Sequence, residues 1–218
     1  MIPLRDVIPS RTVPYLTVTI IILNALAWFY ELGLPREDLP VFLQQFGVVP
    51  AYFAPPTLIS SMFLHGSWSH VLGNMWYLWI FGDNVEDRMG HFRFLIFYLL
   101  CGIAAAFGQI FIDPTSTLPT IGASGAIAGV MGAYFVLYPQ SRVLTLIPLI
   151  VFWEIVELPA IFLLGFWFLM QLFSAGAIAA TANSQSGGVA FMAHVAGFIT
   201  GLVGVFVFRK REPDTRWV

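Results

Sequence analysis

The sequence predicts an all-α membrane protein built from six transmembrane helices. Of its 218 residues, 58% are hydrophobic and only 10% are charged, whereas soluble domains are about 45–50% apolar and about 25% charged. Apolar runs recur along the chain, and nearly all basic residues lie near the two chain ends or near every second connection between runs. The length suits a single membrane domain over residues 1–211, followed by a short cytoplasmic tail, residues 212–218, which we expect to be disordered.

Four apolar runs have about the length of a transmembrane helix, roughly 17–25 residues. They cover residues 13–34, 91–112, 158–180 and 188–208. Between them lie two shorter runs, residues 71–82 and 123–138. The N-terminal residues lack the short apolar core and the cleavage site of a signal peptide, so we expect the first run to remain as an anchor. Six helices place both termini on the same side.

The placement of the basic residues supports this count. The chain has ten Lys and Arg residues, and with six helices all of them except Arg36 lie on one face. Basic connecting segments stay in the cytoplasm, so this face is the cytoplasmic one. We therefore expect an integral, multi-pass protein of a bacterial inner membrane with both termini in the cytoplasm. The chain has no basic footprint for nucleic acid, and its first partner is the lipid bilayer.

Two connecting segments are too apolar for ordinary loops. Residues 33–67 contain five prolines but also many Phe, Leu and Val residues, which predicts a long first outer loop that is partly embedded in the outer leaflet. Residues 144–157 form an apolar stretch that carries Glu154 and Glu157. A seventh helix there would destroy the charge asymmetry, so we expect an interfacial segment on the inner side.

Ser124 lies at the start of a run that is short for a membrane helix. The 16 residues 123–138 span about 24 Å of helix, against about 30 Å of hydrocarbon. The preceding segment, residues 114–122, must then enter the membrane, where irregular backbone is tolerated only beside protein or a water-filled cavity. The sequence therefore predicts a hydrated pocket around Ser124 that opens to the outside.

His194 lies at the same depth in the last apolar run. Ser124 is 14 residues from Tyr138, and His194 is 14 residues from Phe208, which places both about 21 Å above the inner boundary. An ionisable residue inside a membrane helix is a functional-site hypothesis by default. Small residues near both side chains allow close helix approach: Gly125, Gly129, Gly132, Gly197 and Gly201. A Ser–His hydrogen bond fits this spacing, and packing alone explains the same glycines.

His70 and Asn74 are four residues apart and share a helix face near the outer end of the second run. Both could donate hydrogen bonds to an anionic oxygen, and both could equally bridge two helices. No acidic residue lies at this depth in the runs that hold Ser124 and His194. The residues therefore supply a Ser–His dyad rather than a triad.

Four motifs resemble those of the rhomboid intramembrane serine proteases. GASGA at residues 122–126 is similar to the family's nucleophile motif, and AHVAGFITG at 193–201 is similar to its general-base helix. HVLGN at 70–74 resembles the His-xxx-Asn element, and VEDRMG at 85–90 resembles the Glu-xxx-Gly turn on the inner side. The motifs occur in the family's order, and the resemblance covers nearly the whole chain.

The resemblance implies a rhomboid-type six-helix bundle and a role for each matching residue. Ser124 would be the nucleophile and His194 the general base. His70, Asn74 and the Ser124 backbone amide would hold the oxyanion. Supporting roles, structural or in hydrogen bonding, fall to Gly122, Gly125, Gly197, Gly201, His65 and Glu86. No cofactor or metal is expected, and the implied substrates are single-span or other transmembrane proteins.

The chain also departs from some members of the family. Ala128 stands where these have a tyrosine packed on the catalytic histidine, so His194 must be oriented by another group. Gly73 stands where some have a phenylalanine near the entry gate, and the first outer loop has no obvious Trp–Arg pair.

The predicted function is cleavage of transmembrane segments near the outer membrane face by a Ser–His dyad and an oxyanion hole. One alternative is a catalytically silent scaffold of the same fold that binds client helices. A metalloprotease using His65, His70, His91 and His194 is a second alternative, but no His-Glu-xx-His occurs and His91 belongs to the other face. A small-solute transporter is a weaker third alternative, since intramembrane acids that could couple ions are missing.

Overall fold

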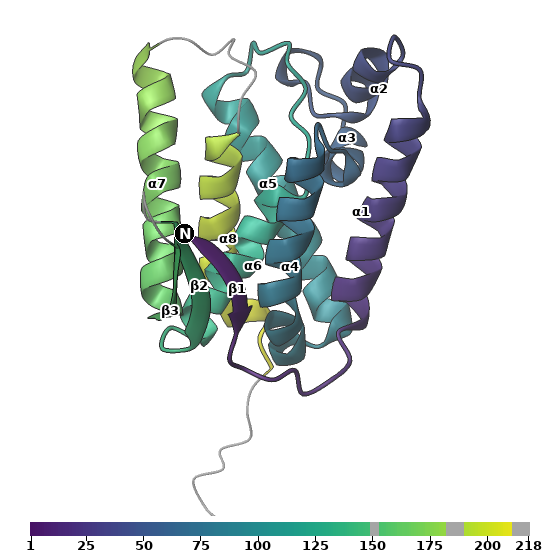
Figure 1. Ribbon diagram of the computed structural model, residues 1–218. Helices are drawn as coiled ribbons and strands as arrows, with labels where there is room; N and C mark the ends of the chain where they lie inside the picture. The colour runs from purple at the N-terminus through teal and green to yellow at the C-terminus, as the bar shows by residue number, and fades with distance from the viewer. Residues whose placement is uncertain (149–152, 182–189, 211–218) are drawn as a thin grey trace, which may run out of the picture.

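The computed structural model describes residues 1–148, 153–181 and 190–210 and shows a helical bundle with a small sheet beside its lower half (Figure 1). Five long helices form the bundle: α1 (Tyr15–Gly33), α4 (Trp68–Met89), α5 (His91–Ile112), α7 (Ala160–Thr181) and α8 (Phe191–Phe208). The shorter α6 (Ser124–Leu137) contacts α4, α5, α7 and α8. The start of α6 therefore lies inside the bundle rather than at its surface.

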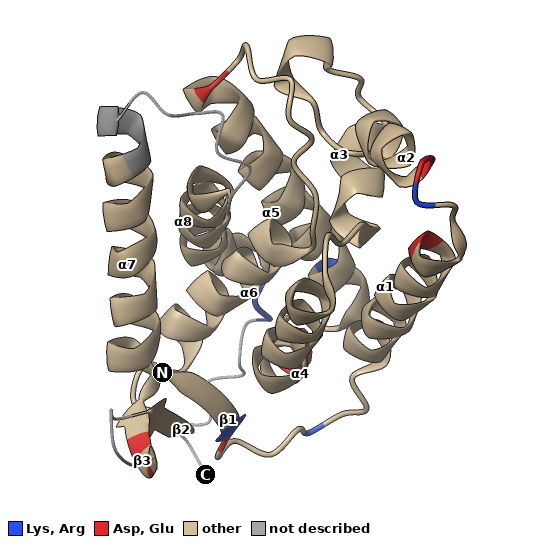
Figure 2. Ribbon diagram, turned by 45° about the horizontal axis from the view of Figure 1, so that its top comes forward, with Lys and Arg blue, Asp and Glu red and all other residues tan. Residues whose placement is uncertain are grey.

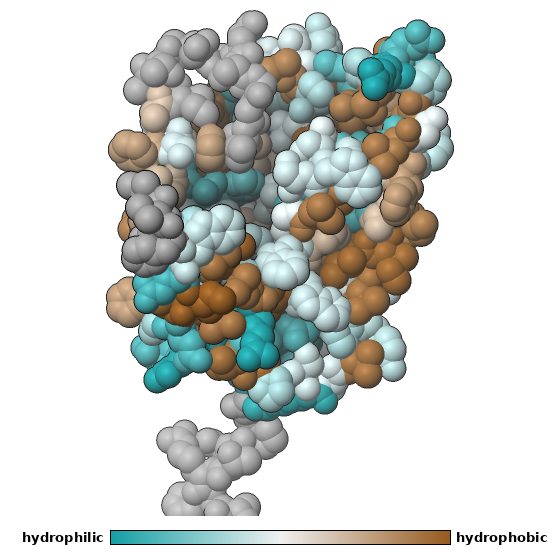
Figure 3. Space-filling model, in the orientation of Figure 1, coloured by the Kyte–Doolittle hydropathy of each residue, from teal (hydrophilic) through white to brown (hydrophobic). Residues whose placement is uncertain are grey.

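The described helices identify the chain as an integral, multi-pass membrane protein. Four are long and apolar enough to cross a membrane, namely α1, α5, the Ala160–Ala177 part of α7, and α8. Large apolar side chains such as Leu26 and Phe29 of α1 are exposed, and Figure 3 shows hydrophobic residues along that side of the molecule. Charged residues gather toward the ends of the helices (Figure 2). Length and composition alone give four spans, so the count of six stays a prediction.

A three-stranded antiparallel sheet corrects the all-α prediction. Its strands are β1 (Ile2–Asp6), β2 (Arg142–Pro148) and β3 (Trp153–Pro159), in the order β1-β2-β3. β2 and β3 occupy the segment for which an interfacial position was expected. Backbone polar groups there still need partners, and pairing with the N-terminal residues, as between Ile2 and Leu146, provides them.

Side chains of two helices fasten β1 to the bundle. The Trp76 indole Nε1 of α4 donates to the Pro3 carbonyl at 2.6 Å. Asn84 Nδ2 of α4 and the Tyr134 hydroxyl of α6 donate to Asp6 Oδ2 at 3.0 and 2.6 Å. Burial raises the pKa of the Asp6 carboxyl to about 6, and the Tyr134 hydroxyl partly opposes this shift. The first residues of the chain are therefore part of the folded domain.

The segment between α1 and α4 contains four short helices, where one long loop was expected. They are α2 (Leu39–Phe46), η1 (Pro50–Tyr52), α3 (Thr57–Ser60) and η2 (Ser61–Phe63). Pro40 and Pro50 stand in the first turns of α2 and η1, where the missing N–H of proline costs no hydrogen bond. The prolines therefore start helices in this segment.

Glu86 joins three helices at the lower end of the bundle. Its carboxylate accepts hydrogen bonds from the backbone amides of Leu16 and Thr17 at 2.9 and 2.8 Å, which satisfies the first turn of α1. The same carboxylate contacts His91 Nδ1 at the start of α5. Gly90, with φ of +80°, makes the turn between α4 and α5. These contacts fit a structural role for Glu86. The expected tail, residues 212–218, lies outside the described residues.

Glycines bring α6 and α8 into backbone contact. A Cβ atom on Gly201 would lie 1.8 Å from the Gly129 carbonyl oxygen, and one on Gly197 would lie 2.0 Å from the Gly125 carbonyl oxygen. No side chain larger than hydrogen fits at either position. This close approach brings the first turns of the two helices together.

Candidate active site

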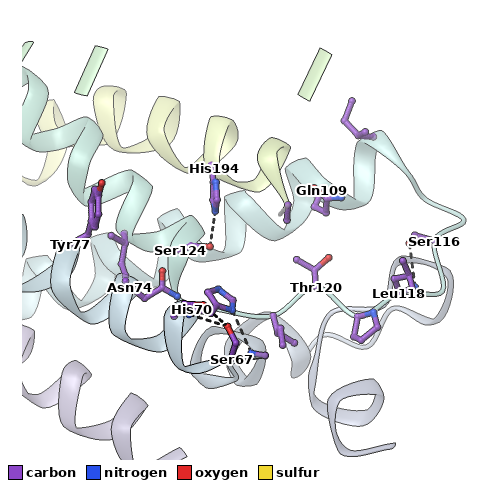
Figure 4. A pocket seen from close by; sticks show the side chains of 18 of the residues that line it. Ser67, His70, Asn74, Tyr77, Gln109, Ser116, Leu118, Thr120, Ser124 and His194 are labelled. Atoms are coloured by element: carbon purple, nitrogen blue, oxygen red, sulfur yellow. Dashed lines mark hydrogen bonds between the residues drawn. The ribbon is translucent and has the colours of Figure 1, made fainter. Parts of the chain in front are cut away.

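Ser124 and His194 form a hydrogen bond across two helices. Ser124 is the first residue of α6, His194 lies in the first turn of α8, and the distance from His194 Nε2 to Ser124 Oγ is 2.8 Å. Figure 4 shows the two side chains pointing toward each other. His194 is 9% exposed and makes a second hydrogen bond through Nδ1. The pair has the geometry that a serine nucleophile and its base require, about 2.6–3.2 Å between heavy atoms.

Ser124 and His194 open onto a cavity of about 860 Å³. Residues of α4, α5, α6, α7 and α8 line it, together with the segment between α5 and α6. Among them are Ser67, His70, Asn74, Tyr77, Gln109 and Thr120, several of which surround the pair in Figure 4. A recess with hydrophilic residues at its base is visible between α4 and α7 in Figure 3. The size lies within the range of about 300–1,000 Å³ that binding pockets occupy.

Hydrogen bonds connect the irregular segment before α6 to the segment between α1 and α4. Val48 and Thr120 form an antiparallel bridge, and the Gly122 amide donates to the Ser61 carbonyl at 2.8 Å. Gly122 has φ of +115°, a conformation that favours glycine. A Cβ atom there would also lie 2.6 Å from His70 Nε2. Gly122 therefore lets the chain turn into α6 directly against His70.

Asn74 and His70 lie on α4, on the opposite side of the cavity from His194 (Figure 4). Asn74 Nδ2 is 3.0 Å from His65 Nε2, and His65 Nδ1 is 3.2 Å from the Phe63 carbonyl oxygen. These distances define one arrangement: His65 Nδ1–H donates to Phe63, and Asn74 donates one N–H to His65 Nε2. The amide nitrogen of Asn74 has two hydrogens, so His65 holds Asn74 while leaving its second N–H available.

Gln171 is a site residue that the sequence did not single out. Its Oε1 atom is 2.8 Å from His194 Nδ1, on the ring edge away from Ser124. Trp167, one turn earlier on α7, lies 5.8 Å from the His194 ring between centroids. Gln171 and Trp167 therefore orient the His194 ring in a chain that has Ala128 at the position where some family members have a tyrosine. In the sequence, Gln171 is visible only as a lone amide in an apolar run, and this pattern does not indicate which residue it contacts.

The four histidines considered for a metal site do not form one cluster. His91 is at the lower end of the bundle on Glu86, and Cys101 is buried in α5. Within the described parts of the chain, no group of three or more His, Cys, Asp or Glu residues could hold a metal ion. His65 and His70 lie close together, with ring centroids 5.0 Å apart, but His194 bonds Ser124 and Gln171 instead.

The fold and the site define a multi-pass helical membrane protein with a Ser–His pair that opens onto a cavity. Residues 55–211, well over half of the chain, match the rhomboid domain. The chain belongs to the rhomboid family, which confirms the resemblance seen in the four motifs.

Similar proteins occur in a plant and in a bacterium. The chain is 28% identical over 198 residues to "Rhomboid-like protein 11, chloroplastic" of Arabidopsis thaliana, covering 86% of this chain and 66% of that protein. It is 28% identical over 161 residues to "RHOMBOID-like protein 6, mitochondrial" of the same plant, with coverage of 73% and 45%. It is 35% identical over 85 residues to "Rhomboid protease GluP" of Bacillus subtilis, with coverage of 39% and 16%. The matched regions thus span between about one sixth and two thirds of these relatives' own lengths.

Proposed function

We propose that this protein is an intramembrane serine protease that cleaves transmembrane segments of other proteins. The observation that carries the proposal is the 2.8 Å contact between Ser124 Oγ and His194 Nε2 beside a cavity inside a membrane bundle. Membership of the rhomboid family and the similarity to a relative named as a protease support it.

In this proposal Ser124 is the nucleophile and His194 the general base. His194 Nε2 takes the proton from Ser124 Oγ as the oxygen attacks the scissile carbonyl carbon. The imidazolium then gives this proton to the leaving amine, and an acyl-enzyme ester remains on Ser124. A water molecule, activated by the same nitrogen, hydrolyses the ester and restores the pair. The cavity gives water a route to the ester.

The oxyanion of the tetrahedral intermediate would be bound by the Ser124 backbone amide, Asn74 and His70. The Ser124 amide is in the first turn of α6, where helix N–H groups have no partner within the helix and the dipole favours negative charge. Asn74 and His70 line the same cavity from α4. The Gly66 amide lies 3.5 Å from His70 Nδ1 and faces it as a donor. With Nδ1 as the acceptor, neutral His70 carries its proton on Nε2, which is then the donor toward the cavity. Donors aimed at charge that develops only in the transition state lower the barrier directly.

The orientation in the membrane is part of the same proposal. With α4 and α6 counted as spans, the chain crosses six times and both termini lie on the cytoplasmic face with most of the basic residues. The cavity then opens toward the outer face, so cleavage takes place near that face. The relatives' names do not support a bacterial inner membrane in particular, since two of the three describe organelles.

A fluorophosphonate probe tests the proposal directly, because it reacts with activated serines. Purified wild-type protein should be labelled, whereas Ser124→Ala should not be labelled and His194→Ala should be labelled far more slowly. A strong chelator should leave labelling unchanged. A folded wild-type protein that resists the probe at the level of Ser124→Ala would instead be a scaffold that binds client helices without cutting them.

A further inference from the structure

The Nδ1 edge of His194 is bound by a neutral amide from a third helix. Gln171 Oε1 on α7 lies 2.8 Å from Nδ1, and Gln171 is buried with 9% exposure. Ser124 comes from α6 and His194 from α8, so three separate helices supply a chain of hydrogen bonds from Gln171 through His194 to Ser124. Nothing in the four family motifs covers this residue.

The acceptor character of Gln171 Oε1 determines which imidazole nitrogen carries the proton. A carbonyl oxygen accepts hydrogen bonds and cannot donate them, so Nδ1 must be the protonated nitrogen. In neutral histidine the other nitrogen, Nε2, is then unprotonated. An unprotonated Nε2 is what a base for the Ser124 hydroxyl needs.

We infer that Gln171 is a positioning residue that holds His194 in its Nδ1–H form and thereby makes Nε2 the base for Ser124. The inference rests on the proposed function for its catalytic meaning, but the hydrogen-bond chain exists whether or not the protein cuts substrates. Because Gln171 belongs to α7, the position of α7 relative to α6 and α8 determines whether this hydrogen bond forms and whether Nε2 is unprotonated.

The surroundings of His194 leave this role to Gln171. The titratable side chains that line the same cavity are His70 and Tyr77 of α4 and Asp113 after α5, and none of them has a hydrogen bond to His194 among the described residues. Trp167 covers the ring at a centroid distance of 5.8 Å. A ring contact restricts the plane of the imidazole but does not distinguish its two nitrogens. Among the residues that the structure describes, Gln171 alone hydrogen-bonds the nitrogen opposite Ser124.

The direct test is the tautomer of His194, read by ¹⁵N NMR of protein labelled at histidine nitrogen. The chain has only four histidines, and the His194→Ala spectrum identifies the His194 signals by their loss. At a pH where the ring is neutral, wild-type protein should show a protonated Nδ1 and an unprotonated Nε2. A protonated Nε2 in the wild type would overturn the inference, and this measurement needs neither a substrate nor a folded variant at position 171.

Two nearly isosteric substitutions separate hydrogen bonding from packing. Gln171→Met removes the acceptor, so the signals should shift toward a mixture of the two tautomers and kcat should fall by roughly 10- to 100-fold, with KM near the wild-type value. Gln171→Glu keeps an oxygen acceptor and should keep the Nδ1–H form. Met170→Leu, at an exposed position of the same helix, controls for changes in α7 itself.

The outcomes distinguish this inference from the proposed function. A wild-type protein with the Nδ1–H form but no probe labelling and no cleavage would contradict the protease and leave the role of Gln171 on the tautomer standing. An active wild-type protein whose Gln171→Met variant keeps both the tautomer and kcat would contradict the role of Gln171 and leave the protease standing.

Discussion

At the scale of single residues, Asn74 has contacts that fit two roles. Its amide nitrogen donates to His65, which connects α4 to the segment before it and fixes the Asn74 side chain. Asn74 also lines the cavity beside His70. A purely structural Asn74 would matter for folding, whereas an oxyanion donor would matter for turnover. The two roles make different predictions for the same substitution.

We expect Asn74→Ala to reduce kcat while the protein stays folded. Loss of one oxyanion donor typically costs on the order of 10²–10³ in kcat, and we expect the lower end of this range or less because His70 and the Ser124 amide remain. Ser124→Ala and His194→Ala should be closer to background, since the nucleophile or its base is then missing. Cleavage kinetics together with thermal unfolding of each variant measure both effects. A destabilised Asn74→Ala protein with unchanged kcat would show that the residue only bridges helices.

The Ser–His pairing was predictable from the sequence because each residue lies 14 residues before the end of its apolar run. Depth in a membrane is a one-dimensional quantity, and counting residues gives it directly. The partner of His194 on its other side was not predictable in this way. Gln171 is a lone amide in an apolar run, so its spacing does not identify a partner. The rotation of α7 that turns Gln171 toward His194 depends on packing between helices, such as the stacking of Phe168 on Phe198 with ring centroids 4.5 Å apart.

At the scale of elements, the α6–α8 contact depends on glycines without side-chain atoms. The Gly201 position faces the Gly129 backbone, and the Gly197 position faces the Gly125 backbone. Backbone atoms cannot rotate away as a side chain does, so any Cβ atom here moves one helix off the other. The helices would then separate next to Ser124 and His194.

Gly201→Ala should therefore lower stability and activity together. Overpacking typically costs about 1–3 kcal/mol and occasionally more, and a separation of the helices also lengthens the Ser124–His194 contact. The matched control is Gly176→Ala in α7, where nothing lies within 4 Å of the added methyl group. The control should be neutral or slightly stabilising, since alanine favours helix more than glycine. Equal unfolding temperatures for the two variants would argue against the close packing.

The pairing of the three strands could not be predicted from the local sequence. Arg142–Pro148 and Trp153–Pro159 are neighbours in the chain, but β1 pairs with β2 across more than a hundred residues, as in Ile2 with Leu146. Local composition marks such segments only as apolar, and a strand needs a partner that the local sequence does not contain. The segment predicted as interfacial, residues 144–157, overlaps β2 and β3, but the strands and their pairing were not predicted.

Asp6 gives the sheet a pH dependence that can be measured. Its pKa is raised from the ordinary value of 3.8 to about 6 by burial. Between these values the unfolded chain releases a proton that the folded protein keeps, so the stability from the protonated carboxyl is complete below about pH 4 and is lost as the pH rises through 6. The unfolding temperature of wild-type protein should fall over this range more steeply than that of Asp6→Asn. Parallel curves would show that Asp6 does not titrate in this way.

At the scale of the whole molecule, the charges predict how the bundle crosses the membrane. All basic residues except Arg36 belong to segments on one face if α4 and α6 are spans. α6 has only 14 residues, about 21 Å of helix, so the positioning of its start inside the bundle depends on the irregular segment around Gly122. The orientation of the cavity depends on the same six-span arrangement.

Single cysteines in a Cys101→Ala background test this arrangement, since the one native cysteine is buried. Glu37→Cys, between α1 and α2, should react with a membrane-impermeant thiol reagent added outside spheroplasts. Gln140→Cys, in the exposed turn after α6, should react only after the membrane is opened. The reverse pattern, or labelling of both from outside, would contradict the six-span topology and the outward opening of the cavity.

The most direct test of the proposed protease is cleavage of a single-span protein by the purified protein reconstituted in lipid vesicles. The account predicts that wild-type protein cuts the substrate near the outer end of its transmembrane segment. Ser124→Ala, with the same fold and lipid content, should be slower by roughly 10³-fold or more, because Ser124 is the one hydroxyl hydrogen-bonded to His194 among the described residues. Mass spectrometry of the products locates the cut. Equal product formation by wild-type protein and Ser124→Ala, or no product from either, would contradict the account.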